Sequence, residues 1–239
     1  MELSIDTSTD VAGIALSEQG VVIALSSWNT AHNHTVELLP NILNLLERGN
    51  CRIQDIGYII VAIGPGSFNG LRVGLSTAKG LSFALNAPVK GVSTLEAIAN
   101  VSADTSLPIC PIIPMGRNEI ATATFRIGEN GLTTVIPEHV TTVSDLCSGI
   151  TEKTFFPGEM TPAQKEELKS RLGELALIIP DENIPERVGC LARLGWCKID
   201  RGHIDNRSAL QPLYLKKPSI TRPKRRRHDA LSNMRARTE

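Results

Sequence analysis

The stretch Gly64-Pro65-Gly66-Ser67 combines residue types that suit ligand binding. It follows the apolar, β-branched run 58–63, which is typical of a strand buried on both faces, and it precedes a helical segment that extends to about Leu85. Glycine lets another group approach the backbone closely, and Ser67 is a suitable N-cap for the helix. Because free N–H groups at a helix start can bind an anion, Gly64, Gly66 and Ser67 are candidate anion contacts. The alternative is a tight, capped turn without a ligand.

The helix after this turn carries little charge for its length. Only Arg72 and Lys79 are charged between residues 68 and 85. Small residues recur at every fourth position, and glycines inside a helix cost roughly 1 kcal/mol each relative to alanine, so a close contact should offset them. We predict that its own sheet covers one side and a second helix, which could belong to another chain, covers the other. The alternative is burial wholly within its own domain. The candidate interface residues on this helix are Gly70, Leu71, Gly74, Leu75, Ala78 and Ser82.

The first hundred residues predict three strands, a helix, a strand, a helix, a strand and a helix, in that order. The first three strands are separated by short turns, so they should form an antiparallel meander. The expected strands cover 3–6, 11–17, 21–27, 58–63 and 88–92, and the expected helices cover 34–48, 68–85 and 94–103.

The second part of the chain begins near Pro108 and also shows a meander followed by helices. In it, Thr161 and Pro162 place an N-cap and a proline at the start of a helix. The expected strands cover 109–113, 119–127, 132–137, 154–156 and 175–179, further helices cover 145–150 and 185–199, and 211–215 is extended. We predict an α/β chain with a first lobe over 1–103, a second lobe over 104–217 and a tail over 218–239. The helix near 185–200 could pack back on the first lobe.

Cysteine and histidine usage predicts no metal site. The five cysteines are scattered without a CxxC pair or zinc spacing, so reduced thiols in a cytoplasmic protein are the simplest interpretation. His32 and His34 are two residues apart and do not share a helix face, and the other three histidines stand alone. The chain has no apolar run long enough to span a membrane, and its start reads as a strand rather than a signal peptide, so we expect no membrane contact.

Two successive units of strands and helices resemble the duplicated lobes of the actin, Hsp70 and sugar-kinase class. The resemblance implies an actin-like ATPase fold in which each lobe has a mixed sheet and flanking helices. In that class an aspartate at the end of the first strand, followed by a Thr/Ser turn, contacts phosphate or metal. The resemblance therefore adds Asp6, Thr7 and Ser8 to the candidate nucleotide contacts. The alternative is an ordinary turn held by side-chain to backbone hydrogen bonds.

Several motifs indicate one particular family within this class. They are Ile5-Asp6-Thr7-Ser8, His34-Thr35 with Leu38-Leu39-Pro40, Gly64-Pro65-Gly66-Ser67-Phe68 with Gly70-Leu71-Arg72 and Gly74, Gly91-Val92-Ser93-Thr94-Leu95, and Pro212-Leu213-Tyr214-Leu215-Lys216. Together they closely resemble the TsaB (YeaZ) family, bacterial accessory proteins of tRNA threonylcarbamoyladenosine synthesis. The resemblance is strong over residues 1–100 and loose over 101–210.

This resemblance implies partners rather than an activity of the chain alone. It implies a paralogous partner, TsaD, which transfers threonylcarbamoyl to the adenosine beside the anticodon, and an ATPase, TsaE. ATP and magnesium are then expected at the level of the complex. The contact with TsaD, or with a second copy in a homodimer, is a bundle of the two first-lobe helices, which adds Leu38, Leu39 and Ile42 to the candidate interface. One motif departs from the family, because Pro114 replaces its aspartate and only Arg117 and Glu119 remain comparable.

Two enzyme classes compete with the accessory role. A sugar-kinase-like phosphotransferase needs a second carboxylate in the cleft, and the obvious position for it carries Pro114. A metalloprotease needs histidines paired at helical spacing, which the sequence lacks.

The basic end of the chain is the last candidate site. From Lys216 onward the sequence has nine basic residues and two acidic ones, a net charge of +7, which leaves −7 on the remainder. Its composition predicts disorder. An unfolded basic segment can neutralise phosphates, so Lys224, Arg225, Arg226 and Arg227 are candidate tRNA contacts. No Phe, Trp or Tyr follows Tyr214, so we do not expect base stacking from the tail itself. The alternative is a solvated terminus.

Overall fold

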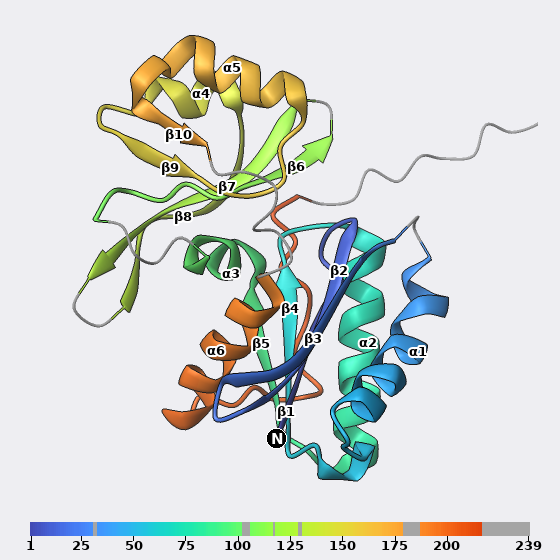
Figure 1. Cartoon of the computed structure of the whole chain (residues 1–239). Coiled ribbons are helices and arrows are strands. Elements are labelled where there is room, and N and C mark those ends of the chain that lie inside the picture. Colours follow the sequence, from blue (N-terminus) through green and yellow to red (C-terminus); the bar gives the residue numbers. More distant parts are fainter. Residues whose placement is uncertain (31–32, 102–105, 117, 129–130, 179–186, 217–239) are drawn as a thin grey trace, which may run out of the picture.

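A five-stranded mixed sheet forms the centre of the first lobe (Figure 1). Its strands have the order β3-β2-β1-β4-β5, with β1 antiparallel to β2 and parallel to β4. They are β1 (Glu2–Asp6), β2 (Val11–Glu18), β3 (Val21–Asn29), β4 (Tyr58–Gly64) and β5 (Val89–Ser93). The structure is a computed structural model that describes residues 1–30, 33–101, 106–116, 118–128, 131–178 and 187–216.

Helices cover both faces of this sheet. On one face lie α1 (His34–Arg48) and α2 (Phe68–Leu85), and on the other lie α3 (Thr94–Asn100) and α6 (Arg187–Asp200) (Figure 1). A short 3-10 turn (Ile53–Asp55) follows α1. The approach of α6 is close, because a Cβ on Gly195 would lie 2.4 Å from Cγ2 of Ile60 in β4. The prediction that the strand over 58–63 is buried on both faces is therefore confirmed.

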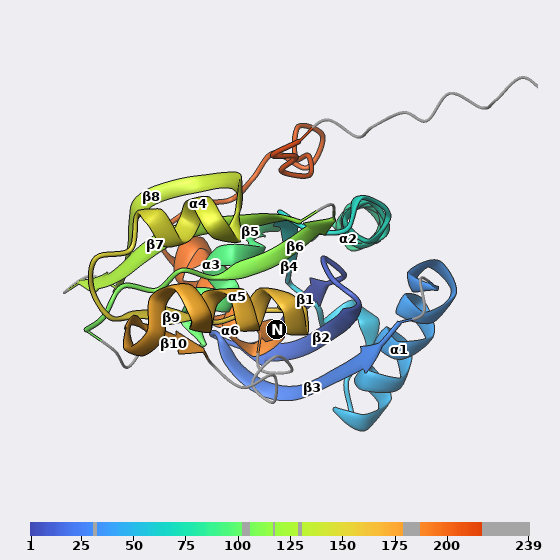
Figure 2. The same ribbon diagram turned by 90° about the horizontal axis from the view of Figure 1, so that it is seen from above.

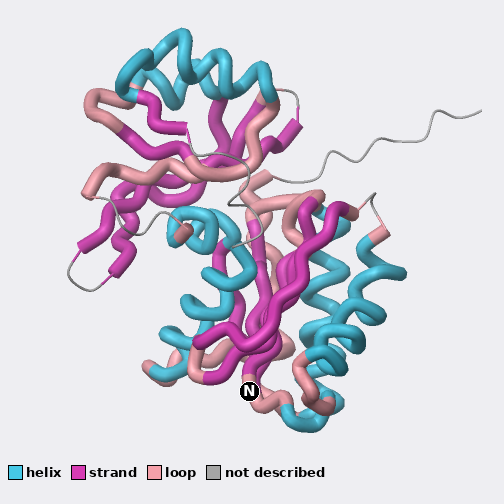
Figure 3. The backbone as a smooth tube through the Cα atoms, in the orientation of Figure 1, coloured by secondary structure: helices cyan, strands magenta, loops and turns pink. Residues whose placement is uncertain are grey.

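The second lobe has two smaller sheets with two helices on its outer side (Figure 3). One sheet has the order β6-β7-β8, and the other pairs β9 with β10 in parallel. The elements are β6 (Ile112–Gly116), β7 (Glu119–Gly128), β8 (Gly131–Thr142), α4 (Val143–Ser148), β9 (Thr154–Phe156), α5 (Pro162–Leu172), a 3-10 turn (Gly173–Leu175) and β10 (Ala176–Ile178). The α/β fold with mixed sheets and flanking helices is as expected.

One strand of the second lobe differs from its prediction. The strand expected over 109–113 begins only at Ile112. Before it, Ile109 exchanges backbone hydrogen bonds with Phe125, and the N–H of Cys110 donates to the carbonyl of Phe155 at 2.8 Å. This segment therefore links β7 to β9 instead of extending β6. The apolar residues of the sequence do not show which strands the segment will pair with.

After α6 the chain returns along the first lobe as a segment that we call the C-terminal strap, residues 205–216. Oδ2 of Asp205 accepts from the N–H of Gly91 at 2.7 Å, and the N–H of Leu213 donates to the carbonyl of Ile63 at 2.7 Å. Residues 211–215, expected to be extended, are not part of a sheet. Among the residues described, no helix is long and apolar enough to cross a bilayer.

Candidate functional site

The two stretches with predicted anion contacts lie against each other. The N–H of Ser67 donates to the carbonyl of Ser8 at 2.7 Å. A Cβ on Gly66 would lie 2.1 Å from that same carbonyl oxygen, so only glycine permits this approach. Gly64 has φ +108°, a conformation that favours glycine, and Ser67 caps α2 by accepting from the N–H of Gly70. The structure thus brings the first-strand turn and the glycine turn together at the carboxyl ends of β1 and β4.

Asp6 is already engaged within its own turn. Its Oδ1 accepts from the N–H of Ser8 at 2.9 Å and from the Ser8 hydroxyl at 2.5 Å. This is the hydrogen-bonded turn that the sequence offers as the alternative to a ligand site. The side chain of Thr7 points to α2, since its hydroxyl donates to the carbonyl of Gly70 at 2.7 Å.

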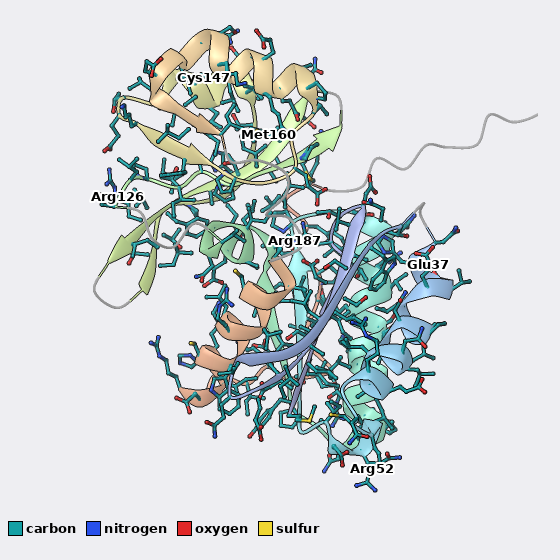
Figure 4. The ribbon with its side chains drawn as sticks, in the orientation of Figure 1. Glu37, Arg52, Arg126, Cys147, Met160 and Arg187 are labelled. Atoms are coloured by element: carbon teal, nitrogen blue, oxygen red, sulfur yellow. The ribbon has the colours of Figure 1, made fainter. Side chains whose placement is uncertain are left out.

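The other oxygen of Asp6 binds an arginine that sequence reasoning missed. Arg187 begins α6, is 3% exposed and lies at the junction of the lobes (Figure 4). Its Nε donates to Oδ2 of Asp6 at 2.6 Å and its Nη1 to Oε1 of Glu159 at 2.8 Å. Its Nη2 donates to Oγ1 of Thr9 at 2.9 Å and to the carbonyl of Val11 at 2.7 Å. All three nitrogens of the guanidinium therefore have partners, and one cation joins two carboxylates from different lobes.

The Arg187 side chain stays charged in this setting. Burial acts to lower the pKa of Arg187, but the charges of Asp6 and Glu159 and the hydrogen bonds to them outweigh burial and raise it. The space lined by Asp6, Gly13, Arg187 and Val188 does not admit even a water molecule. The guanidinium therefore occupies the space beside Oδ2 of Asp6.

A second carboxylate at the junction comes from Glu159, and not from position 114, where the sequence carries proline. Glu159 follows Gly158, whose φ is +119° and whose added Cβ would lie 2.2 Å from the carbonyl oxygen of Ile112. This close packing on β6 directs the segment toward the first lobe, where Oε1 of Glu159 also accepts a short hydrogen bond from the Thr9 hydroxyl. Pro114 itself lies in β6, opposite Ile120.

The small-residue stripe of α2 has a different role from the expected one. A Cβ on Gly70 would lie 2.1 Å from the carbonyl oxygen of Thr7, and one on Gly74 would lie 2.3 Å from the Thr7 hydroxyl. The hydroxyl of Ser82 donates to the carbonyl of Ala87 at 2.6 Å. The stripe therefore packs on the chain's own first turn and loop, which is the alternative of burial within one domain.

We expect Gly70→Ala to destabilise the fold. The new methyl group would meet backbone, which cannot rotate away, and overpacking of this kind costs typically 1–3 kcal/mol or more. Gly80→Ala on the same helix is the matched control, because nothing lies within 4 Å of its added Cβ, and we expect it to stabilise by up to about 1 kcal/mol. Urea unfolding of both variants measures the difference. Equal stability of the two variants would contradict the close packing at Thr7.

Most of the apolar side chains that α1 and α2 expose are not among the predicted interface residues. Of the nine predicted interface residues, the structure buries Gly70, Leu71, Gly74, Leu75, Ala78, Ser82, Leu38 and Ile42, and it exposes only Leu39. Exposed beside Leu39 on α1 are Val36 and Leu43, and Phe83 on α2 is 78% exposed. We call Val36, Leu39 and Leu43 the exposed helix face, whereas the Phe83 ring lies 5.6 Å from the guanidinium carbon of Arg207 in the strap. The two helices lie side by side at one end of the molecule (Figure 2).

A second charged cluster joins the lobes on the side of α3. Glu138 of β8 accepts a short hydrogen bond from the Ser93 hydroxyl, and Nζ of Lys198 lies 2.5 Å from Oε2 of Glu96. These side chains line a cavity of about 500 Å³ together with Phe125, Leu213 and Leu215. Burial raises the pKa of Glu138, the charge of Glu96 raises it further, and the Ser93 hydrogen bond and Lys198 oppose both.

This raised pKa predicts a pH-dependent effect of Glu138→Gln. Because the pKa of Glu138 is higher in the folded state than in the unfolded chain, its stabilising contribution is complete below about pH 4 and is lost as the pH rises through the folded pKa. The variant should therefore gain melting temperature relative to the wild type at pH 7 and lose that advantage at pH 4. Thermal unfolding at both pH values measures this, and an equal difference at both would contradict it.

Two groups of predicted site residues lie outside the described residues. They are Arg117 and the basic residues Lys224, Arg225, Arg226 and Arg227. Glu119, the other residue comparable with the family motif, forms an ion pair with Lys216 of the strap, 2.6 Å from Oε2 to Nζ.

Comparisons with known proteins identify the family. The family model described as "TsaD: tRNA N6-adenosine threonylcarbamoyltransferase" matches residues 25–176. The tRNA threonylcarbamoyladenosine biosynthesis protein TsaB of Bacillus subtilis is 32% identical over 74% of this chain and 78% of its own length. Its namesake in Escherichia coli is 31% identical over 54% of this chain and 57% of its own length.

Among solved structures, YeaZ from Pseudomonas aeruginosa has the same fold. It matches with a TM-score of 0.76 and 22% identity, over 90% of this chain and 99% of that one. The chain therefore belongs to the TsaD family as the family model defines it, and within it to the TsaB family of tRNA threonylcarbamoyladenosine biosynthesis proteins.

Proposed function

We propose that this chain is a non-catalytic, accessory subunit in tRNA threonylcarbamoyladenosine synthesis, where it supports a TsaD partner that carries out the transfer. Membership of the TsaB family supports the pathway. The observation that carries the non-catalytic role is the position of Arg187, whose guanidinium lies between Asp6 and Glu159 with every nitrogen bonded. A guanidinium held between the two carboxylates takes the position that a metal ion would need for phosphoryl transfer, so the cluster is suited to joining the lobes rather than to catalysis.

The rival function is a sugar-kinase-like phosphotransferase. Glu159 favours it, because two carboxylates face one point at the junction of the lobes. Arg187 argues against it, because its guanidinium neutralises one carboxylate charge and closes the space beside Asp6 that a metal ion would need. Removing Arg187 from that position would leave the buried Asp6 and the half-buried Glu159 without this counterion, which is strongly unfavourable.

The exposed helix face is the surface that we propose for TsaD. Scattered single apolar residues are normal on a surface, but Val36, Leu39 and Leu43 share one side of α1, and α2 beside it carries little charge. A second copy of this chain could use the same face in a homodimer. TsaE and ATP with magnesium enter the proposal at the level of the complex, and the whole assembly is expected in the cytoplasm.

The proposed function is tested by reconstitution with purified TsaD, TsaE and tRNA. We expect threonylcarbamoyladenosine formation to require this chain, and we expect the chain alone to hydrolyse no ATP. Asp6→Asn and Glu159→Gln each remove one carboxylate partner of Arg187, so both variants are assayed and each is first checked for folding by thermal unfolding. Magnesium-dependent ATP turnover by the isolated wild type, abolished in either variant, would support the phosphotransferase instead. Full modification without this chain would reject the accessory role.

A further inference from the structure

The cavity of about 500 Å³ beside α3 lies at the junction of the two lobes, and we call it the interlobe cavity. Residues of β5, α3 and α6 line it from the first lobe, and residues of β7 and β8 line it from the second lobe, which packs on α3 (Figure 1). The C-terminal strap forms a third side. Small-molecule sites commonly have volumes of roughly 300–1,000 Å³ and often lie between domains, so the size and the place of this cavity suit a small ligand.

One part of the lining is apolar. The Phe125 ring of β7 is buried, and the strap adds the half-buried side chains of Leu213 and Leu215. Thr134 and Pro137 of β8, which also line the cavity, are exposed. The cavity therefore reaches from the surface to the core of the second lobe, and it offers a hydrocarbon group a place out of water.

The other part of the lining carries an excess of negative charge. Nζ of Lys198 lies 2.5 Å from Oε2 of Glu96, so this ammonium group already has a carboxylate partner. Glu138 accepts a hydrogen bond from the Ser93 hydroxyl, and among the described residues it has no ion pair. An ionised carboxylate has room for about four hydrogen bonds. Two carboxylates and one ammonium group give the cavity a net charge of −1 and leave Glu138 able to bind a cation.

This lining excludes several classes of ligand. A phosphate or nucleotide would be repelled by the net negative charge. A hard metal ion needs about six oxygen ligands, whereas much of this lining is hydrocarbon, and the described part of the chain has no group of three or more His, Cys, Asp or Glu side chains that could hold a metal. A cation that also carries an apolar group satisfies both parts of the lining.

We propose that the interlobe cavity binds a small organic amine, whose ammonium group donates to Glu138. The hydrocarbon body of the amine lies against Phe125, Leu213 and Leu215. Burial and the charge of Glu96 raise the pKa of Glu138, and a bound ammonium group would oppose both effects by favouring the ionised carboxylate. The ligand would contact both lobes and the strap, so its binding should also stabilise the folded chain. The inference is independent of the proposed accessory function.

The test compares three ligands of similar size by titration calorimetry on the full-length chain at pH 7, where an alkylammonium group is charged. Phenethylamine is the amine probe, phenethyl alcohol replaces its ammonium group by a hydroxyl group, and phenylacetate carries the opposite charge. We expect the amine to bind at least about tenfold more tightly than the alcohol, because hydrogen bonds between charged groups are the stronger ones. Phenylacetate should bind more weakly than either, since the two carboxylates repel it.

Substitutions assign the binding to this cavity. Glu138→Gln keeps the shape of the side chain and removes its charge, so we expect it to weaken the amine by about tenfold and to leave the alcohol unchanged. Because this variant should be more stable than the wild type at pH 7, a loss of amine binding would not result from unfolding. Leu213→Ala shortens the apolar side and should weaken the amine and the alcohol by the same factor. Glu152→Gln is the matched control, since it removes an exposed carboxylate that pairs with Arg126 outside the cavity.

Four results would overturn the proposal. They are equal affinity of the wild type for the amine and the alcohol, unchanged amine binding by Glu138→Gln, an equal loss of amine binding in Glu152→Gln, and no binding of the amine at concentrations of several millimolar. A fourth ligand, Nα-acetyl-lysine methylamide, presents the ammonium group on a peptide. If it bound more tightly than phenethylamine, the cavity would belong to a lysine side chain of a partner and not to a free amine. None of these measurements uses TsaD or tRNA, so they can fail while the proposed function holds, and the reverse.

Discussion

Arg187→Met is expected to lower the free energy of unfolding by about 3–5 kcal/mol, since removing one partner of a buried charge pair leaves the other uncompensated. Here two carboxylates depend on the same guanidinium, at 2.6 Å from Asp6 and 2.8 Å from Glu159. Methionine keeps the length and the apolar stem of the side chain, so the loss reports on charge and hydrogen bonding rather than on a cavity. For a chain of this size the melting temperature should fall by roughly 6–20 °C.

Two further variants test whether the loss of stability comes from the uncompensated charges. In Asp6→Asn/Arg187→Met one uncompensated charge is removed, so the double variant should be more stable than Arg187→Met alone. Arg193→Met on the same helix is the matched control, because Arg193 is exposed and its Nη2 donates only to the sulfur of Cys190, and it should change stability by less than about 0.5 kcal/mol. Thermal and urea unfolding measure all three. A loss no larger for Arg187→Met than for Arg193→Met would show that the buried cluster does not join the lobes.

The first lobe could be predicted closely from sequence because its signals are local. The run 58–63, the capping residue Ser67 and the low charge of 68–85 each depend on neighbours in the chain, and β4 and α2 fall where those signals place them. Ser67 and Thr161 both cap their helices as expected. The helix predicted over 94–103 is shorter than expected, since it ends at Asn100 with Val101 as its C-cap.

The charge cluster at the junction could not be predicted in the same way. Arg187, Asp6 and Glu159 come from three distant parts of the chain, and no spacing rule links them. One local signal was present: Arg187 stands four residues before Leu191 and eight before Gly195, on the side of α6 that the structure buries. A lone basic residue at the buried spacing of a helix indicates a buried ion pair, although it does not identify the partner.

The small-residue stripe shows how a correct local observation can be assigned to the wrong neighbour. The sequence predicts that something approaches α2 closely at Gly70 and Gly74, and this is so. The approaching group is the backbone and hydroxyl of Thr7, because the strand β1 that precedes Thr7 pairs with β4, which leads into α2. Only the pairing of strands decides which segment reaches the glycines, and strand pairing is a long-range property.

Substitutions on the exposed helix face are expected to weaken the association of this chain with TsaD. We expect Leu39→Asp combined with Leu43→Asp to weaken that association by more than about 30-fold, because a carboxylate would be buried at the centre of an apolar contact, where a few residues carry most of the binding energy. Both side chains are exposed in the free chain, at 49% and 55%, so its stability should change little. Titration calorimetry with purified TsaD measures the affinity.

A control variant shows whether the loss of TsaD affinity is specific to the exposed helix face or follows from a new charge at any exposed apolar residue. Val135→Asp places the same charge on β8 of the second lobe, where Val135 is 53% exposed, and should leave TsaD binding unchanged. Gly74→Leu gives the opposite contrast, since its side chain would collide with the Thr7 hydroxyl and should reduce stability before it affects an interface. If Leu39→Asp/Leu43→Asp binds TsaD as tightly as Val135→Asp does, the partner contacts another surface. A loss of affinity confined to the double variant, with an unchanged melting temperature, would place TsaD on α1.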